Sequence, residues 1–368
     1  MNIMSQLPSI RWGILTTGKI ASWYVADLVL SRPDAEVRHI VQAIGTSDIN
    51  RGKSFAEKYC PEENSRIYGS YEEVYQDPNV DIVYIGTPHA FHKKNCLDAI
   101  AAGKHVLCEK PFTLNAREAK VIFEAAREKG VFIAEAMWLR HRPLTLELQR
   151  LLHKEKVIGE VFRATSDFGS ELDIPNLPLD KYYRQNALGA GSLLDMGIYS
   201  LTWVILALDP ELTANREKPK ILASQNHWED VETATSAILQ FPDTGRQGIF
   251  TSTTKANVNP DLLARIYGTN GSVEVHGGCP SLPEAFTVYP KYEGEPGAEP
   301  GSKLTRGQGK TYDFTAPGRG FLYQADNIAL DVLNGKLESS IIPQAETIRM
   351  MEIMDEVRRQ GGTRYPVD

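Results

Sequence analysis

The first part of the chain alternates short apolar runs with amphipathic stretches. The apolar runs, which are typical of buried strands, cover residues 10–15, 36–44, 82–85, 105–108 and 131–134. Amphipathic stretches typical of helices cover residues 20–30, 51–59, 70–76, 91–102 and 115–129. This alternation predicts βαβ units, and hence a doubly wound parallel sheet with helices on both faces over residues 1–140.

The pattern changes after residue 140. Strand-like segments now follow one another, at residues 161–168, 235–241, 248–254 and 272–276. They predict a largely antiparallel sheet, and therefore an α+β second domain over residues 141–368. Residues 290–320 contain eleven Gly or Pro residues and predict a long irregular loop. Helical patterns at 321–333 and 345–360 close the chain, and we expect these helices to pack near the first domain.

Composition narrows the class of protein. The 368 residues are 42% hydrophobic and 24% charged, as in a soluble globular protein, and the net charge of −7 argues against a nucleic-acid partner. The apolar stretch 196–208 is too short to span a bilayer, and the N-terminal 15 residues do not resemble a secretory signal. Four dispersed cysteines without a CxxC pair predict no zinc site or disulfide framework. We expect a cytoplasmic protein without bound metal or a membrane partner.

The turn after the first strand has the parts of a dinucleotide site. A strand, a glycine-bearing turn and a helix N-terminus together bind a pyrophosphate. Only Gly18 and Ala21 match the G-x-G-x-x-G/A fingerprint, because Thr16 occupies its first glycine position. A simple βα turn looks similar, but its place before successive βα units favours the dinucleotide interpretation. The residues predicted to contact the cofactor here are Thr16, Thr17, Gly18, Lys19 and Ile20.

The end of the second strand bears on the choice between NAD and NADP. Thr46, Ser47 and Arg51 favour the 2′-phosphate of NADP. Asp48 is the counter-argument, since it is either an NAD-type acid or a cap of the next helix. We therefore expect NADP, with NAD as the alternative.

The ends of later strands predict the rest of the cleft, because ligands bind beyond the carboxyl ends of parallel strands. Lys110, at a strand end before Pro111, is placed to polarise the substrate oxygen and to lower the pKa of a neighbouring acid; the alternative is a solvated surface lysine. The Lys110–Pro111 bond is also a candidate for the cis form. His89 and His92 flank the cofactor, although each taken singly favours a structural role. The other cofactor contacts predicted at these ends are Thr87, Pro88 and Glu109.

Asp195 and Tyr199 form the second catalytic candidate. Their i, i+4 spacing places both on one face of a helix. Tyr199 can accept the proton of a substrate hydroxyl if a nearby ammonium stabilises its phenolate, because its ordinary pKa of about 10 is too high at neutral pH. The alternative is that Tyr199 packs in a core and Asp195 caps the helix locally.

Five strings in the chain, WGILTTGKIA, VDIVYIGTPHAFH, AGKHVLCEKPFTLNAREA, EAMWLRHRP and LLDMGIY, resemble the Gfo/Idh/MocA oxidoreductase family. They resemble in particular its branch of dimeric dihydrodiol dehydrogenases and fungal NADP-dependent D-xylose 1-dehydrogenases. The resemblance implies a Rossmann domain followed by a domain whose open sheet mediates homodimerisation.

The same resemblance implies roles for individual residues. Lys110 and Tyr199 would lie at the substrate hydroxyl, and Asp195 matches the acidic member of the second motif. Trp138 and Arg140 match a segment that lines the cofactor and substrate cleft. Many family members have histidine at the position of Tyr199, so the tyrosine indicates the dihydrodiol and xylose branch, whereas Thr16 departs from the small residue usual there.

The resulting hypothesis is NADP-dependent oxidation of a cyclic polyol, such as the C1 hydroxyl of D-xylose, to a lactone. One alternative is trans-dihydrodiol oxidation or carbonyl reduction. Another is a non-catalytic NADP-sensing regulator, against which the joint presence of Lys110 and Tyr199 argues.

Overall fold

The computed structural model describes residues 7–210, 212, 216–292 and 305–368, and over these ranges the chain divides into two compact units. Unit 1 is formed by residues up to Arg142, by Ala316–Glu352 and by Val367. Unit 2 is formed by Pro143–Thr315, Ile353–Pro366 and Asp368. The first six residues of the N-terminal stretch discussed above, and residues 293–304 of the expected loop, lie outside the described residues.

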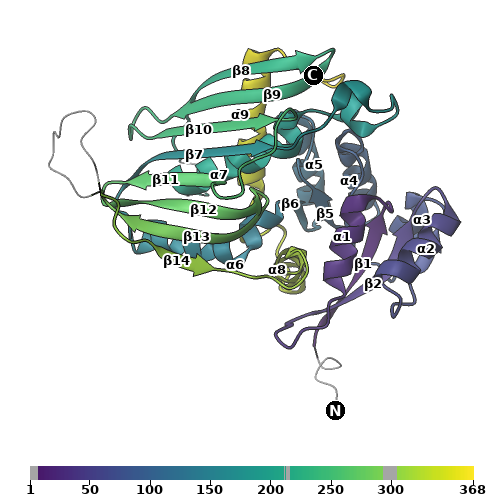
Figure 1. Cartoon of the computed structure of the whole chain (residues 1–368). Helices are drawn as coiled ribbons and strands as arrows, with labels where there is room; N and C mark the ends of the chain where they lie inside the picture. Colours follow the sequence, from purple (N-terminus) through teal and green to yellow (C-terminus); the bar gives the residue numbers. More distant parts are fainter. Residues whose placement is uncertain (1–6, 211, 213–215, 293–304) are drawn as a thin grey trace. The chain divides into compact units, whose positions relative to one another are not determined.

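Unit 1 contains a parallel sheet, as predicted. In the described part of the chain it has six strands in the order β3-β2-β1-β4-β5-β6, which is that of a Rossmann fold. Figure 1 labels β1, β2, β5 and β6 of this sheet. The strands are β1 Ser9–Leu15, β2 Arg38–Gly45, β3 Arg66–Tyr68, β4 Ile82–Ile85, β5 His105–Glu109 and β6 Ile133–Ala136. The order reverses between β1 and β4, and ligands bind at such a reversal. The short edge strand β3 was not among the predicted strands.

The helices of unit 1 follow the predicted pattern closely. They are α1 Lys19–Leu28, α2 Ile49–Tyr59, α3 Tyr71–Gln76, α4 His92–Ala101, α5 Ala116–Lys129 and α8 Phe321–Leu333, with the 3₁₀ turns η2 His89–Phe91 and η3 Trp138–His141. Asp27 of α1 explains why α8 belongs to this unit. Its buried carboxylate accepts hydrogen bonds from the backbone N–H groups of Arg319 (2.9 Å) and Phe321 (2.8 Å), and so caps the start of α8.

Unit 2 contains a largely antiparallel sheet, also as predicted. Among the described residues it has eight strands in the order β14-β13-β12-β11-β7-β10-β9-β8, and only the β7–β10 pair is parallel (Figure 1). The strands are β7 Val161–Gly169, β8 Lys220–Trp228, β9 Val231–Gln240, β10 Gln247–Thr253, β11 Ala264–Gly268, β12 Gly271–Cys279, β13 Leu282–Pro290 and β14 Lys310–Asp313.

Strand β14 corrects the prediction that residues 290–320 form only an irregular loop. It pairs with β13, so that Tyr312 lies opposite Phe286 and their rings stack with centroids 4.9 Å apart. Thr311 and Tyr312 are good strand formers, whereas the glycines and prolines that suggested a loop lie on either side of them.

One face of the unit 2 sheet is covered by helices. The chain runs through α6 Pro143–Gln149 and the π-helical stretch η4 Arg150–Lys154, and later through the π-helical stretch η8 Leu193–Gly197 into α7 Ile198–Leu208. Every residue of α7 is buried, which explains its apolar sequence. Among the described residues, no helix is both long enough and apolar enough to cross a membrane. The last helix, α9 Gln344–Gly361, begins in unit 1 and ends in unit 2.

Candidate active site

The turn after β1 has a strained backbone. Thr16 has φ = +76°, a conformation that is unusual for a β-branched residue. Its N–H donates to the carbonyl of Gly45 (3.0 Å), and a Cβ added to Gly86 would lie 3.6 Å from its methyl group. Such strain costs roughly 1–3 kcal/mol and is found mainly where function needs it. The strained turn at Thr16 therefore makes the end of β1, beside β4, a candidate site.

Gly18, at the start of α1, has space around it. Its φ of −74° suits any residue, and a Cβ there would come within 4 Å only of the Thr16 hydroxyl oxygen, at 3.6 Å, among the described residues. Within the described residues, no side-chain hydrogen bond caps the start of α1. Neither conformation nor packing thus requires a glycine, which leaves the helix N-terminus open to an anionic ligand. This turn fits the pyrophosphate of a dinucleotide.

In the segment after β2, Asp48 forms the hydrogen bonds of a helix cap. Its Oδ1 accepts hydrogen bonds from the N–H groups of Asn50 (2.9 Å) and Arg51 (3.2 Å), so it caps α2. The Arg51 side chain reaches back to donate to the carbonyl of Thr17 (3.4 Å). Thr46 is buried and Ser47 is exposed. Arg51 therefore lies beside the dinucleotide turn, and Asp48 acts as a helix cap.

His92 connects the two strand-end segments predicted to border the cofactor. Its ring is buried, with Nε2 2.8 Å from the carbonyl oxygen of Thr87 and Nδ1 3.1 Å from that of Pro111. Burial lowers the pKa of His92. The ring of His89, which is also buried, lies 5.6 Å from that of His92. These contacts match the structural alternative for His92; Pro88 directly precedes η2.

Two buried glutamates hold the segment that carries Lys110, whose bond to Pro111 is cis. The Glu109 carboxylate accepts hydrogen bonds from the Tyr84 hydroxyl (2.7 Å) and from the backbone N–H of Lys110 (3.2 Å). Glu135 accepts the N–H of Phe112 (3.1 Å) and the hydroxyl of Thr347 (3.0 Å). Burial raises the pKa of Glu135 to about 7. The side chain of Lys110 itself is half-buried.

Trp138 and Arg140 are integrated into the core of unit 1. The indole of Trp138 stacks on Phe321 with centroids 4.2 Å apart. Arg140 forms a buried ion pair with Glu346 of α9. Both side chains are almost completely buried. Their contact with a cofactor stays a prediction.

Asp195 and Tyr199 lie on one continuous helical stretch of unit 2, whose first part is π-helical. Asp195 is in η8 and Tyr199 is the second residue of α7. The Tyr199 ring is 5.9 Å from that of Phe168, and its side chain is buried. The Asp195 carboxylate is the main cause that raises the pKa of nearby Tyr183 to about 12. Two aromatic side chains that the sequence did not predict, Phe168 and Tyr183, therefore lie near the candidate catalytic residues.

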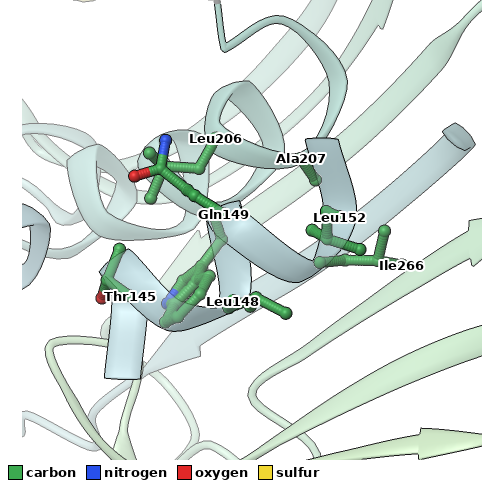
Figure 2. Close-up of a pocket in the computed structure, with 8 residues that line it drawn as sticks. Thr145, Leu148, Gln149, Leu152, Leu206, Ala207 and Ile266 are labelled. Atoms are coloured by element: carbon green, nitrogen blue, oxygen red, sulfur yellow. The ribbon is translucent and has the colours of Figure 1, made fainter. Parts of the chain in front are cut away.

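An apolar hollow elsewhere in unit 2 contains none of these residues (Figure 2). It is lined by Thr145, Leu148, Gln149, Leu152, Trp203, Leu206, Ala207 and Ile266. Two of these side chains, Thr145 and Gln149, are polar uncharged ones, and the hollow therefore has neither an acid nor a base for catalysis.

Residues 10–136 match the model of the oxidoreductase family with an NAD-binding Rossmann fold, Gfo/Idh/MocA, and residues 146–274 match a C-terminal domain of the same family. The chain belongs to the Gfo/Idh/MocA oxidoreductase family. The predicted family, the fold class and an oxidoreductase with a dinucleotide-binding Rossmann domain are thereby confirmed.

Individual relatives of this oxidoreductase cover nearly its whole length. The chain is 35% identical to the D-xylose 1-dehydrogenase (NADP(+)) of Hypocrea jecorina, over 97% of the chain and 93% of the relative. It is 34% identical to the trans-1,2-dihydrobenzene-1,2-diol dehydrogenase of Sus scrofa, over 98% of the chain and 99% of the relative. A crystal structure of a 3-ketoreductase from Actinomadura kijaniata with NADP and TDP-benzene has the same fold, with a TM-score of 0.76, 23% identity and coverage of 96% of this chain and 98% of that one.

Proposed function

We propose that this oxidoreductase is a cytoplasmic, NADP-dependent dehydrogenase that oxidises the C1 hydroxyl of an aldopyranose such as D-xylose to the lactone. The observation that carries the proposal is the full-length similarity to a D-xylose 1-dehydrogenase that uses NADP. The presence of both Lys110 and Tyr199 supports a catalyst rather than a sensor, because a sensor has no need of a proton-transfer pair. The free thiols of Cys60, Cys96, Cys108 and Cys279 are compatible with a reducing compartment.

The cofactor would be held at the turn after β1. Backbone N–H groups at the start of α1 would bind the pyrophosphate, and Gly18 leaves room for its approach. Arg51, held beside Thr17, supplies the positive charge that a 2′-phosphate needs. Because Asp48 caps α2, its carboxylate is already hydrogen-bonded to the N–H groups of Asn50 and Arg51. When bound, NADP⁺ accepts a hydride from the substrate carbon.

Proton transfer would be the work of Tyr199. Its phenolate takes the proton of the substrate hydroxyl while C1–O becomes the carbonyl of the lactone. The ammonium of Lys110 stabilises the phenolate and so lowers the pKa of Tyr199 toward the working pH. Asp195, on the preceding turn of the helix, orients the hydroxyl groups of the substrate. Lys110 belongs to unit 1, whereas Asp195 and Tyr199 belong to unit 2.

Oxidation of a trans-dihydrodiol is the second candidate. It is supported by the 34% identity to the dihydrodiol dehydrogenase of Sus scrofa, and by the aromatic rings of Phe168 and Tyr183 around Tyr199 and Asp195. The diene part of such a ring would pack against these side chains.

We also propose a homodimer formed through the face of the unit 2 sheet opposite α7. Leu222, Ile238 and Ile249 lie side by side on three neighbouring strands of this face. Leu222 is 53% exposed, and the other two are half-buried. A second copy of the chain would cover this apolar row.

The test is a panel of aldoses and trans-diols assayed with NADP and with NAD at 340 nm. We expect D-xylose with NADP to give the highest kcat/KM. Tyr199→Phe should lower kcat by about a thousandfold, within the range for loss of a general base, while leaving the Kd for NADPH unchanged. A trans-diol as best substrate would support the second candidate instead. Full turnover by Tyr199→Phe would refute the assignment of the base.

A further inference from the structure

Glu232, the second residue of β9, is a buried carboxylate at the start of the helical stretch that carries Asp195 and Tyr199. Its side chain is 1% exposed. Its Oε2 accepts the backbone N–H of Leu193 (2.8 Å), and its Oε1 accepts the hydroxyl protons of Ser192 (2.7 Å) and Thr235 (3.0 Å). A side chain of strand β9 thus caps the N-terminus of a helical stretch that lies earlier in the chain.

The chain leading into this helix is shaped to let the carboxylate approach. Gly191 has φ = +145°, where side chains are rare, and a Cβ there would lie 3.1 Å from Glu232 Oε2. Because the Ser192 hydroxyl donates to Glu232, it accepts from Ser252 of β10 (2.9 Å). A Cβ at Gly197 would lie 2.9 Å from the same Ser252 oxygen. Two strands therefore hold the first turn of the helix.

A local cap would be simpler if stability were the only requirement. Serine, asparagine or aspartate at the N-cap itself normally satisfies the first N–H groups of a helix, and Ser192 occupies that position without capping its own helix. Here a glutamate is buried instead, which is costly unless its hydrogen bonds are well formed. Asp195 follows Leu193 by two residues, so the Leu193–Glu232 hydrogen bond sets the start of the turn on which Asp195 lies.

We infer that Glu232 is a positioning residue for catalysis, which holds Asp195 and Tyr199 in their working orientation through its hydrogen bonds to Ser192 and Leu193. The inference rests on the proposed function, because that function assigns proton transfer to Tyr199 and orientation of the substrate to Asp195. Glu232 does not itself take part in that transfer. A displacement of a catalytic group by about 1 Å can lower a rate a hundredfold, so a change at Glu232 should be felt mainly in kcat.

The experiment compares Glu232→Gln, Glu232→Asp and Ser192→Ala with Glu274→Gln. Glu274 is a matched control, since it is a buried glutamate of the same sheet whose carboxylate pairs with Arg265 and Arg306, away from the helix start. We expect Glu232→Gln to lower kcat by about 10- to 100-fold with an unchanged Kd for NADPH. Glu232→Asp should recover part of the rate, and Ser192→Ala should lose only a fewfold. Glu274→Gln should keep the wild-type kcat.

The deuterium isotope effect on the oxidation of C1-deuterated substrate separates positioning from simple loss of folded protein. A smaller folded fraction lowers kcat without changing the isotope effect. A misplaced Tyr199 makes chemistry slower, so the isotope effect in Glu232→Gln should reach its full intrinsic value. An isotope effect below the intrinsic value in Glu232→Gln, or a wild-type kcat, would overturn the inference. If Tyr199→Phe is inactive, that result leaves the proposed function intact. If Tyr199→Phe has full activity, the proposed function fails, and the role of Glu232 with it.

Discussion

The helices that carry the two parts of the candidate site begin in opposite ways. Helix α1 begins after Gly18 without a side-chain cap among the described residues. The helical stretch with Asp195 and Tyr199 begins with its first N–H bonded to the buried Glu232 carboxylate. At both starts the first N–H groups have no partner within the helix, and the helix dipole has its positive end there. At the start of the helical stretch with Asp195 and Tyr199, the protein itself supplies the anion. At the start of α1, that position is left to a ligand.

The glycines at these starts differ accordingly. Gly191 is required by the protein itself, because it has a positive φ and touches Glu232. Gly18 is required by neither conformation nor packing. A glycine at a helix start is therefore informative about ligands only when neither the backbone conformation nor the packing requires it.

The largest expected effect concerns Glu135, the carboxylate that closes the Lys110 segment of unit 1 by accepting the Phe112 N–H. Burial raises the pKa of Glu135 from 4.5 to about 7. Between these values the unfolded chain releases the proton and the folded chain keeps it. Stability from this group is therefore complete below pH 4.5 and is lost as the pH rises to 7, by about 3 kcal/mol in total.

Urea unfolding of the wild type and of Glu135→Gln at pH 5 and pH 7.5 tests this. The free energy of unfolding should fall less with rising pH in Glu135→Gln, and the variant should gain on the wild type by up to about 3 kcal/mol. Taking the difference in free energy of unfolding between the two proteins removes the contribution of every other group whose titration the substitution does not change. Parallel pH profiles would show that Glu135 has the same pKa in the folded and the unfolded chain.

Gly191→Ala is expected to have the next largest effect. It forces a side chain into a positive φ and brings a methyl group to 3.1 Å from Glu232 Oε2. We expect a loss of about 2 kcal/mol in the free energy of unfolding, together with a lower kcat.

Gly245→Ala is the matched control for this prediction. Gly245 also has a positive φ, of +71°, but an added Cβ meets nothing within 4 Å in the described structure. The free energy of unfolding of Gly245→Ala should fall by about 1 kcal/mol, which is the cost of the backbone conformation alone, and kcat should stay at the wild-type value. Equal losses of stability and activity in the two variants would mean that the contact with Glu232 does not matter.

Most of unit 1 could be predicted from the sequence because its strands are buried on both faces. Such strands are continuous apolar runs, as at Ile82–Ile85, and the helices between them have clear amphipathic patterns. In unit 2 one face of the sheet is not covered by α6 and α7, so strands such as β8 alternate half-buried and exposed residues and give a weak signal. Strand β14 was missed because its four residues stand among glycines and prolines.

The sequence predicted candidate site residues only where they lie close together in a short sequence motif. Lys110, Asp195 and Tyr199 belong to compact strings, and the turn at Gly18 follows a strand. Glu135 and Glu232 act on segments 23 and 39 residues away, at Phe112 and Leu193, so no local spacing reveals them. Their one sequence signal is a glutamate within an apolar or β-branched strand, where an unpaired charge would be costly. Arg140 illustrates the converse, since its ion pair with Glu346 was not foreseen.

Gly18→Ala has the smallest expected effect and tests the open helix start directly. The added methyl group would lie at an ordinary distance, 3.6 Å, from the Thr16 hydroxyl oxygen, and φ is already −74°. The free energy of unfolding should therefore change by less than about 1 kcal/mol. The Kd for NADPH, measured by fluorescence titration, should rise about tenfold, or 1.4 kcal/mol, because the methyl group occupies space needed by the pyrophosphate. A large loss of stability would mean that the protein itself needs this glycine, as it does Gly191. An unchanged Kd in a stable variant would place the pyrophosphate elsewhere, and the open start of α1 would then be no guide to the cofactor.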